Sequence, residues 1–181
     1  LEPHARRLGR LIRRLGNAVQ RTLIRYREDV LDRQLEQSRI AWAAMELFAN
    51  VTHRWVMHGP GWFLHASHHR ARHGPLEWND LYAVIFAIPS IALIYGGVQG
   101  GWGDWATAVG AGIAAYGAIY FGFHDVIVHN RLPHRIVPRS AYFKRIVQAH
   151  RLHHAVESRL GAVSFGFLVA PPVDVVKAQL R

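Results

Sequence analysis

The sequence predicts an all-α integral membrane protein, a helical bundle with a histidine-rich dimetal site at the cytoplasmic face of the membrane. Three observations predict this architecture. Two uncharged apolar stretches of helical length, residues 81–98 and 105–123, are joined by a glycine-rich turn. Ten of the thirteen histidines follow one repeated spacing on either side of these stretches. Basic residues gather beside the histidines, as the charge bias of cytoplasmic loops predicts.

Composition narrows the chemistry and the partners. A chain of 181 residues has the length of one domain. The absence of cysteine excludes disulfides, cysteine-ligated iron–sulfur clusters and thiolate-ligated haem. A net charge of +10 suits either nucleic acid or an anionic membrane surface. Because no nucleic-acid motif accompanies the apolar stretches, we expect membrane lipid as a partner and no nucleic acid.

Residues 1–39 are predicted to form an N-terminal extension to the main domain at residues 40–181. In residues 1–27, apolar side chains recur at spacings of three and four among arginines, which predicts a basic amphipathic helix. A membrane-surface anchor, a targeting segment and a plain basic extension all fit this pattern. Residues 28–39 are a polar helical stretch. The apolar stretch 40–55 would be roughly 24 Å long as a helix, short of a full span, so a tilted or half-buried helix is expected.

The histidines form two sets, each with the spacing His-x4-His followed by His-x2-His-His. The triplet positions i, i+3 and i+4 share one face of a helix, so three imidazoles can point at one place. The members of each His-x4-His pair would lie roughly 140° apart on an α-helix. We therefore expect these pairs to flank the cluster, with the first helix unwinding at Gly59–Gly61. The sets are His53, His58, His65, His68 and His69, and then His124, His129, His150, His153 and His154.

The two apolar stretches predict a membrane hairpin. Asn79 or Asp80 suits the N-cap of the first helix. Asp104 opens the second helix, whose glycines and alanines permit close helix packing. Both ends of a hairpin return to the same side, and both ends carry histidines. The hairpin therefore predicts that the two histidine sets meet at one membrane face.

Three features follow the hairpin. Asp125 is expected either to orient the imidazole of a metal ligand or to pair with Arg131 or Arg135. Residues 140–155 predict a helix capped by Ser140 that carries the second triplet at its end. Residues 162–172 are too short to span a membrane. They fit a re-entrant or interfacial segment that closes the site or lines a substrate groove, and equally a simple packing strand or helix.

The ligand type limits the metal chemistry. Neutral imidazole suits zinc, copper, iron and nickel. One zinc ion takes three or four ligands, so ten histidines predict two metal ions. Two redox-active metals beside a membrane predict O2-dependent oxidation of a greasy substrate.

The residues just described resemble the membrane fatty acid hydroxylase and sterol desaturase superfamily and, within it, the bacterial-type beta-carotene 3-hydroxylases. The resemblance rests on the two histidine sets, on residues 77–83 and on residues 163–172, and covers about residues 44–172. The family usually has a full apolar helix before the first histidine pair, whereas residues 28–39 are charged here.

The resemblance implies a non-haem di-iron monooxygenase, with two Fe as cofactor and O2 as co-substrate. It implies 3-hydroxylation of β-ionone rings, which converts beta-carotene through cryptoxanthin to zeaxanthin, and a keto-carotenoid is a further candidate substrate. Electrons would come from ferredoxin and its reductase, and the protein would lie in the bacterial inner membrane. The implied metal ligands are His53, His58, His65, His68, His69, His124, His129, His150, His153 and His154.

Three alternatives stay open from the residues. A membrane sterol or fatty-acyl hydroxylase or desaturase would use the same histidine di-iron site. A membrane metal transporter or storage protein would need ligands across the bilayer, whereas these histidines gather on one side. A structural or lipid-surface protein led by the basic helix would leave the repeated histidines unexplained.

Overall fold

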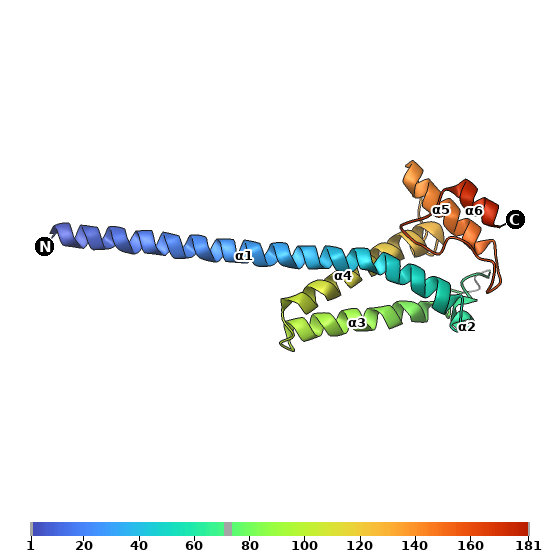
Figure 1. Ribbon diagram of the computed structural model, residues 1–181, viewed down its shortest axis with the longest axis horizontal. Coiled ribbons are helices and arrows are strands. Elements are labelled where there is room, and N and C mark those ends of the chain that lie inside the picture. The colour runs from blue at the N-terminus through green and yellow to red at the C-terminus, as the bar shows by residue number, and fades with distance from the viewer. Residues whose placement is uncertain (1, 71–73, 181) are drawn as a thin grey trace.

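The computed structural model describes residues 2–70 and 74–180, and throughout those residues the regular structure is helical, with no strand. Figure 1 shows a long first helix, a helical hairpin beside it, and a compact end that holds both the C-terminus and the short helices. The elements in chain order are α1 (Glu2–Thr52), η1 (His53–Met57), α2 (Trp62–His65), α3 (Asp80–Val98), α4 (Asp104–Tyr120), η2 (Phe121–Val128), α5 (Ala141–His154) and α6 (Val173–Gln179).

The predicted hairpin is formed by α3 and α4. Small residues let the two helices approach closely, and the Ser90 hydroxyl donates to the Gly110 carbonyl at 2.8 Å. Two helical stretches, Asp80–Val98 and Asp104–Val128, are long and apolar enough to cross a membrane, with mean hydropathies of 2.0 and 1.4. Only 17% and 28% of these stretches are buried within the protein, so most of their apolar surface faces outward. The hairpin therefore resembles lipid-facing helices more than the core of a soluble domain.

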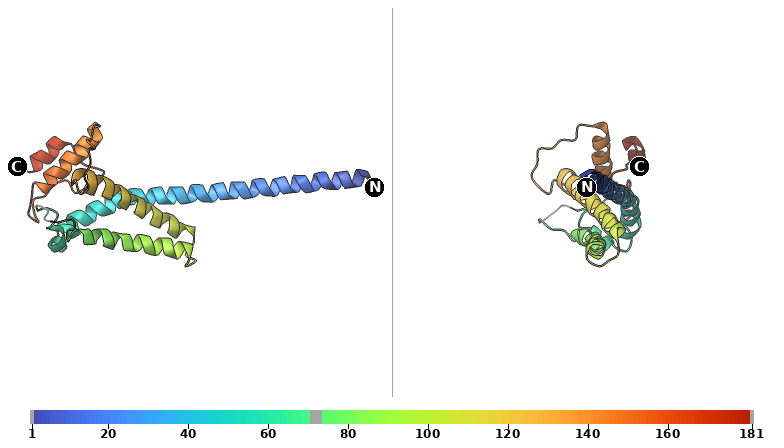
Figure 2. Two further views of the ribbon diagram at one scale, coloured as in Figure 1. Left: turned by 180° about the vertical axis from the view of Figure 1, so that it is seen from behind. Right: turned by 90° about the vertical axis from the view of Figure 1, so that its left-hand side faces the viewer.

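α1 is one continuous helix from Glu2 to Thr52, and it passes without a break through the boundaries at residues 27/28 and 39/40 that the sequence suggests. Residues 13–29 are exposed along their whole length, and Figures 1 and 2 show this part extending past the turn between α3 and α4. Packing on α4 begins at Ser38, whose hydroxyl donates to the Ala108 carbonyl at 2.7 Å. The division into domains at residues 39 and 40 stays a prediction, since the helix runs through it without a break.

The two His-x4-His pairs lie on π-helical turns, η1 and η2, rather than on α-helix. The backbone N–H of His58 donates to the carbonyl of His53 at 2.9 Å, and the N–H of His129 donates to the carbonyl of His124 at 2.9 Å. These are i to i+5 bonds, which widen the helix and bring residues five apart onto nearly one face. The helix does break at Gly59–Gly61, between η1 and α2, as expected. The first pair is aligned by the π-helical turn that ends before those glycines.

The C-terminal part closes the compact end. α5 starts as predicted at Ser140, whose hydroxyl accepts from the Phe143 N–H at 3.2 Å. Residues 156–172 contain no helix or strand and run along the histidines before α6. Beneath them lies a hydrophobic core built around Tyr116, Phe123, Ile146, Phe167 and Val176.

Candidate metal centre

The structure gathers all ten histidines of the repeated pattern into two groups of five. Within each group, one ring nitrogen from every histidine lies within 4.8 Å of the others. Five nitrogens bound to one ion at about 2.1 Å would lie roughly 3 to 4 Å apart, so this spacing fits a metal ion. Group 1 is His53, His58, His65, His69 and His153, and group 2 is His68, His124, His129, His150 and His154.

The two groups do not coincide with the two sets in the sequence. His68, the middle histidine of the first triplet, belongs to group 2, whose other members come from the second set. His153, the middle histidine of the second triplet, belongs to group 1, whose other members come from the first set. The positions i, i+3 and i+4 spread over one face, so the middle side chain can reach across to the neighbouring group. Each group is therefore completed by a residue from the other side of the hairpin, and neither half of the chain builds a group alone.

The outer nitrogen of most of these imidazoles is held by an oxygen acceptor. The Nδ1 atom faces a backbone carbonyl, an amide oxygen or a carboxylate at 2.7 to 3.2 Å in seven of the ten histidines. Such oxygens only accept, so each Nδ1 carries the proton and each Nε2 presents a lone pair. The seven are His53, His58, His65, His68, His69, His124 and His153.

Those lone pairs point at one another. The Nε2 atoms lie 3.1 Å apart between His53 and His65, 3.2 Å apart between His58 and His153, and 3.3 Å apart between His68 and His124. The Tyr120 hydroxyl can donate to His124 Nε2 at 3.2 Å. No proton is left to bridge the other two pairs, so their facing lone pairs repel unless a cation lies between them. The buried Nε2 atoms of His69 and His154 have no protein partner. This donor set fits a metal ion in each group, because bare imidazole nitrogen is a metal ligand.

Burial keeps the imidazoles neutral. Burial, with a smaller contribution from the neighbouring His53, lowers the pKa of His65 to about 2. Burial likewise lowers the pKa of His69 to about 4, against the opposing effect of its bond to the Val156 carbonyl. Neutral imidazole is the form that binds metal, so the site is ready for metal at neutral pH.

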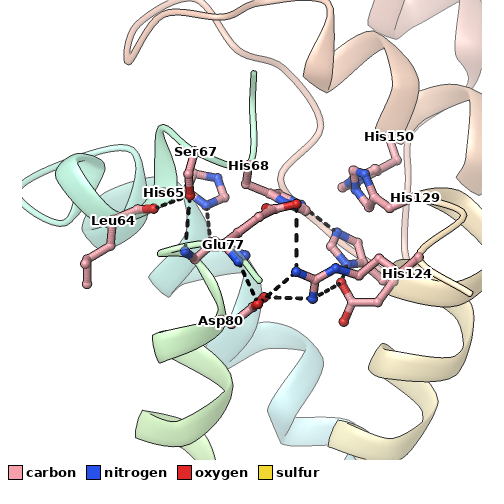
Figure 3. A network of polar contacts seen from close by, with 12 residues as sticks. Leu64, His65, Ser67, His68, Glu77, Asp80, His124, His129 and His150 are labelled. Carbon is pink, nitrogen blue, oxygen red and sulfur yellow. Dashed lines mark hydrogen bonds and ion pairs between the residues drawn. The ribbon is translucent and has the colours of Figure 1, made fainter. Parts of the chain in front are cut away.

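Three side chains hold histidines in place, of which the sequence indicated this role for Asp125 and not for Asn79 or Glu77. The Asn79 side chain was expected to cap α3, but its oxygen accepts from His65 Nδ1 at 2.7 Å, and it makes no cap hydrogen bond. Glu77 faces His68 Nδ1 at 3.0 Å, as Figure 3 shows. Asp125 lies 3.2 Å from His124 Nδ1 and 3.8 Å from the Arg131 guanidinium, so both contacts considered for it in the sequence occur together.

Residues 156–165 supply carbonyl acceptors that periodicity could not reveal. The carbonyls of Val156, Arg159, Val163 and Phe165 accept from His69, His58, His153 and His53, respectively. The segment predicted at 162–172 therefore lies against the site. Glu46 anchors it, because one carboxylate oxygen accepts from the backbone N–H groups of Phe167, Leu168 and Val169 at 2.8 to 3.0 Å. A lone acid in the apolar stretch 40–55 was the visible signal for this role.

An apolar cavity of about 530 Å³ reaches the histidines from the hairpin. It runs along α3 from Asn79 to Ser90, a rise of about 16 Å. At one end it meets His53 of group 1 and His124 and His150 of group 2. A second cleft of about 330 Å³ is lined by four histidines of group 2 together with Arg70 and Arg151. Of the three histidines outside the pattern, His134 lies in the loop before α5, whereas His73 and the His4 side chain fall outside the described residues.

The comparisons with known proteins give one result for the N-terminal helix and another for most of the chain. The family model of the ACAD9/ACADV C-terminal domain matches residues 1–53, a range that contains α1 and ends at His53, the first histidine of the repeated pattern. This match covers under a third of the chain and assigns no family to the rest. No solved structure matches the chain.

Curated relatives cover most of the chain. It is 53% identical over 138 residues to a beta-carotene hydroxylase of Pantoea ananas, across 76% of this chain and 77% of that protein. A beta-carotene hydroxylase of Paracoccus sp. (strain PC1) is 51% identical, across 76% of this chain and 84% of that protein. The chloroplastic beta-carotene hydroxylase 1 of Capsicum annuum is 38% identical, across 70% of this chain and 40% of that protein. On this identity over most of its length, the chain belongs to the beta-carotene hydroxylase family.

Proposed function

We propose that the protein hydroxylates the β-ionone rings of carotenoids at C3, converting beta-carotene through cryptoxanthin to zeaxanthin. The observation that carries this proposal is its identity of 50% or more to four bacterial beta-carotene hydroxylases. Each turnover would consume one O2, two electrons and two protons, insert one oxygen atom into a C–H bond, and release one water. The same relatives favour carotenoid chemistry over a sterol or fatty-acyl hydroxylase or desaturase, and over a transporter.

Two iron ions would be held by the histidines, one in each group. Bound iron would supply the activation of O2 that the organic side chains cannot provide. The protein's own contribution is to hold the ten imidazoles around the two ions. In seven of them the bond at Nδ1 keeps Nε2 directed inward. Seven of the ten imidazoles are buried, and this limits the access of water to a reactive centre.

The apolar cavity would hold the ring and part of the polyene. Its volume is in the range of small-molecule sites, and a carotenoid offers little for a polar group to bind. Position is therefore set by shape. Gly117 lines this cavity, and a Cβ added there would have no neighbour within 4 Å.

A leucine at Gly117 would fill cavity space. Gly117→Leu is expected to lower ring hydroxylation at least about tenfold, because a misplaced reacting carbon costs orders of magnitude in rate. Its iron content should stay that of the wild type. Gly122→Leu is the matched control, since a Cβ at Gly122 also has open space but Gly122 does not line the cavity. Equal turnover by both variants would argue that the substrate binds elsewhere.

The protein would be an integral helical bundle of the bacterial inner membrane. The outward apolar surface of α3 and α4 supports embedding, and the packed part of α1 would join them. The metal centre would then lie at the cytoplasmic face, where Arg54, Arg70 and Arg151 accompany the histidines. Ferredoxin, reduced by its reductase, would deliver electrons at the cleft between Arg70 and Arg151, both of which are exposed.

Pigment chromatography of beta-carotene-accumulating bacteria tests the proposal. Cells that express the chain should form cryptoxanthin and zeaxanthin only in the presence of oxygen. His153→Ala should abolish both products while the protein stays in the membrane fraction, because His153 is fully buried in group 1. Unchanged beta-carotene with wild-type protein present in the membrane would contradict the proposed reaction.

A further inference from the structure

The two histidine groups differ in the charge of the groups that hold them. In group 1 every Nδ1 acceptor is neutral. Four are backbone carbonyls, at 3.0 Å from His53, 3.1 Å from His58, 2.8 Å from His69 and 2.8 Å from His153. The fifth is the Asn79 amide oxygen, 2.7 Å from His65.

In group 2 two histidines are held by carboxylates instead. Glu77 Oε2 lies 3.0 Å from His68 Nδ1, and Asp125 Oδ1 lies 3.2 Å from His124 Nδ1. Both carboxylates are largely shielded from solvent, with side chains 11% and 15% exposed. Water screens such charges weakly, so they act on the imidazoles and on an ion beyond them.

Arg131 joins these carboxylates into one network. Its guanidinium lies 2.7 Å from Asp80, 3.8 Å from Glu77 and 3.8 Å from Asp125. Figure 3 labels Glu77 and Asp80 of this network together with His68 and His124. Glu77, Asp80 and Asp125 therefore all lie within 4 Å of one guanidinium, behind His68 and His124.

A cation lies behind an aromatic ring that contacts group 1. The Arg54 guanidinium lies 5.6 Å from the centre of the Phe165 ring. That ring contacts His53, His58 and His153. Neutral acceptors and a neighbouring cation both make group 1 the less favourable place for a metal cation.

We propose that the two groups hold their metal ions unequally, with group 2 binding its ion more tightly and favouring its oxidised form. This inference rests on the proposed dimetal centre. A carboxylate behind a ligating imidazole makes the imidazole a stronger donor, and loss of such a partner typically costs about 10- to 100-fold in metal affinity. Glu77 and Asp125 are positioning residues, because they act on the metal through His68 and His124.

Release of iron measures the inequality directly. The whole protein in detergent is loaded anaerobically with Fe(II) and mixed with excess ferrozine, and the coloured chelate is followed in time. We expect two phases of equal amplitude, the slow one from group 2. Glu77→Gln keeps an oxygen acceptor but removes the charge, and should speed the slow phase about 10- to 100-fold while the fast phase stays unchanged.

The reciprocal variant places a charge on group 1. Asn79→Asp puts a carboxylate at the acceptor of His65, and should slow the fast phase alone. Glu157→Gln is the control, because this carboxylate is exposed and should change neither phase. With ⁵⁷Fe, Mössbauer spectra should show two quadrupole doublets of equal area, only one of which changes in Glu77→Gln.

The outcomes separate the two proposals. Release in a single phase with one doublet, or acceleration of the fast phase by Glu77→Gln, would overturn the inequality. A folded chain that takes up no Fe(II) would instead contradict the proposed metal centre.

Discussion

In α1, residues 13–29 are exposed along their whole length, whereas residues 38–50 lie against α4 and the segment before α6. Both parts belong to one unbroken helix. In the first part, arginines and leucines alternate with helical period and contact no other element. In the second part, single side chains such as Ser38 and Glu46 make specific bonds to distant residues. A shared backbone conformation therefore does not imply a shared source of stability.

Acid should have the largest effect, and it should act on the histidine groups beside the packed part of α1 and not on residues 13–29. The pKa values of His65 and His69 are lowered on folding, to about 2 and about 4, so the unfolded chain takes up protons below pH 6.5 that the folded chain does not. Stability is then fully present above pH 6.5 and falls as the pH drops toward 4. Thermal melting of the metal-free protein in detergent at pH 7.5, 6 and 5 should give steadily lower midpoints.

A matched variant assigns this acid loss to the histidine end. His69→Gln removes one titrating group. The free energy of unfolding should then fall less steeply with decreasing pH, because the unfolded chain takes up about one proton fewer. Midpoints that do not depend on pH would mean that the imidazoles are not held neutral by burial.

Removing the carboxylate of Glu46 should have the next largest effect. It accepts from three backbone N–H groups and from the Tyr116 hydroxyl at 2.8 Å. Glu46→Ala leaves these donors without their acceptor, which should cost about 3 kcal/mol or more in free energy of unfolding. It should also loosen the Val163 and Phe165 carbonyls that hold His153 and His53, so iron content should fall as well.

Glu46→Gln distinguishes the anchor from a general need for a polar residue. Glutamine keeps one oxygen for the three N–H groups, and its NH2 can donate to the Tyr116 oxygen. We expect it to lose less than half of the stability that Glu46→Ala loses. Equal losses would indicate that the negative charge, rather than the acceptor geometry, holds the segment.

The contact where the packed part of α1 begins should be next in size. A Cβ added at Gly112 would meet the Ser38 carbonyl and the Ala41 side chain on α1. Gly112→Ala should therefore push α1 away from α4 and destabilise the protein by about 1–3 kcal/mol. Gly117→Ala, on the same helix with open space, should be neutral or slightly stabilising. Thermal midpoints measured side by side check this contrast.

The sequence predicts those features of the fold and the site that depend on residues close together in the chain, and it misses those that depend on tertiary placement. The hairpin, the helix after Ser140 and the convergence of the histidines follow from local patterns and one topological step, and the structure has all three. The wide turns at His53 and His124 escaped, because the spacing of five was judged on an α-helical wheel. The exchange of His68 and His153 between groups depends on tertiary placement, which spacing within one triplet does not encode.

The supporting residues were harder to predict for a different reason. Backbone carbonyls such as those of Arg159 and Val163 carry no side-chain signature. Asn79 occupied the position expected of a helix cap, so its local role concealed its bond to His65. Only Glu46 and Asp125 were visible as charges in apolar surroundings, and each has a specific partner in the structure.

The exposed part of α1 should give the smallest effect. Val19 and Leu23 are each 59% exposed and contact no core residue, so replacing both with alanine removes no packing. Alanine is also at least as favourable in a helix as either residue. We expect a change within about 0.5 kcal/mol in detergent, with unchanged iron content and hydroxylation. If the same double variant detaches the protein's N-terminal segment from anionic vesicles, the apolar stripe serves the membrane surface, as the amphipathic pattern predicts. A loss of iron or of melting temperature in detergent would instead mean that residues 13–29 support the site, and the contrast between the two parts of α1 would fail.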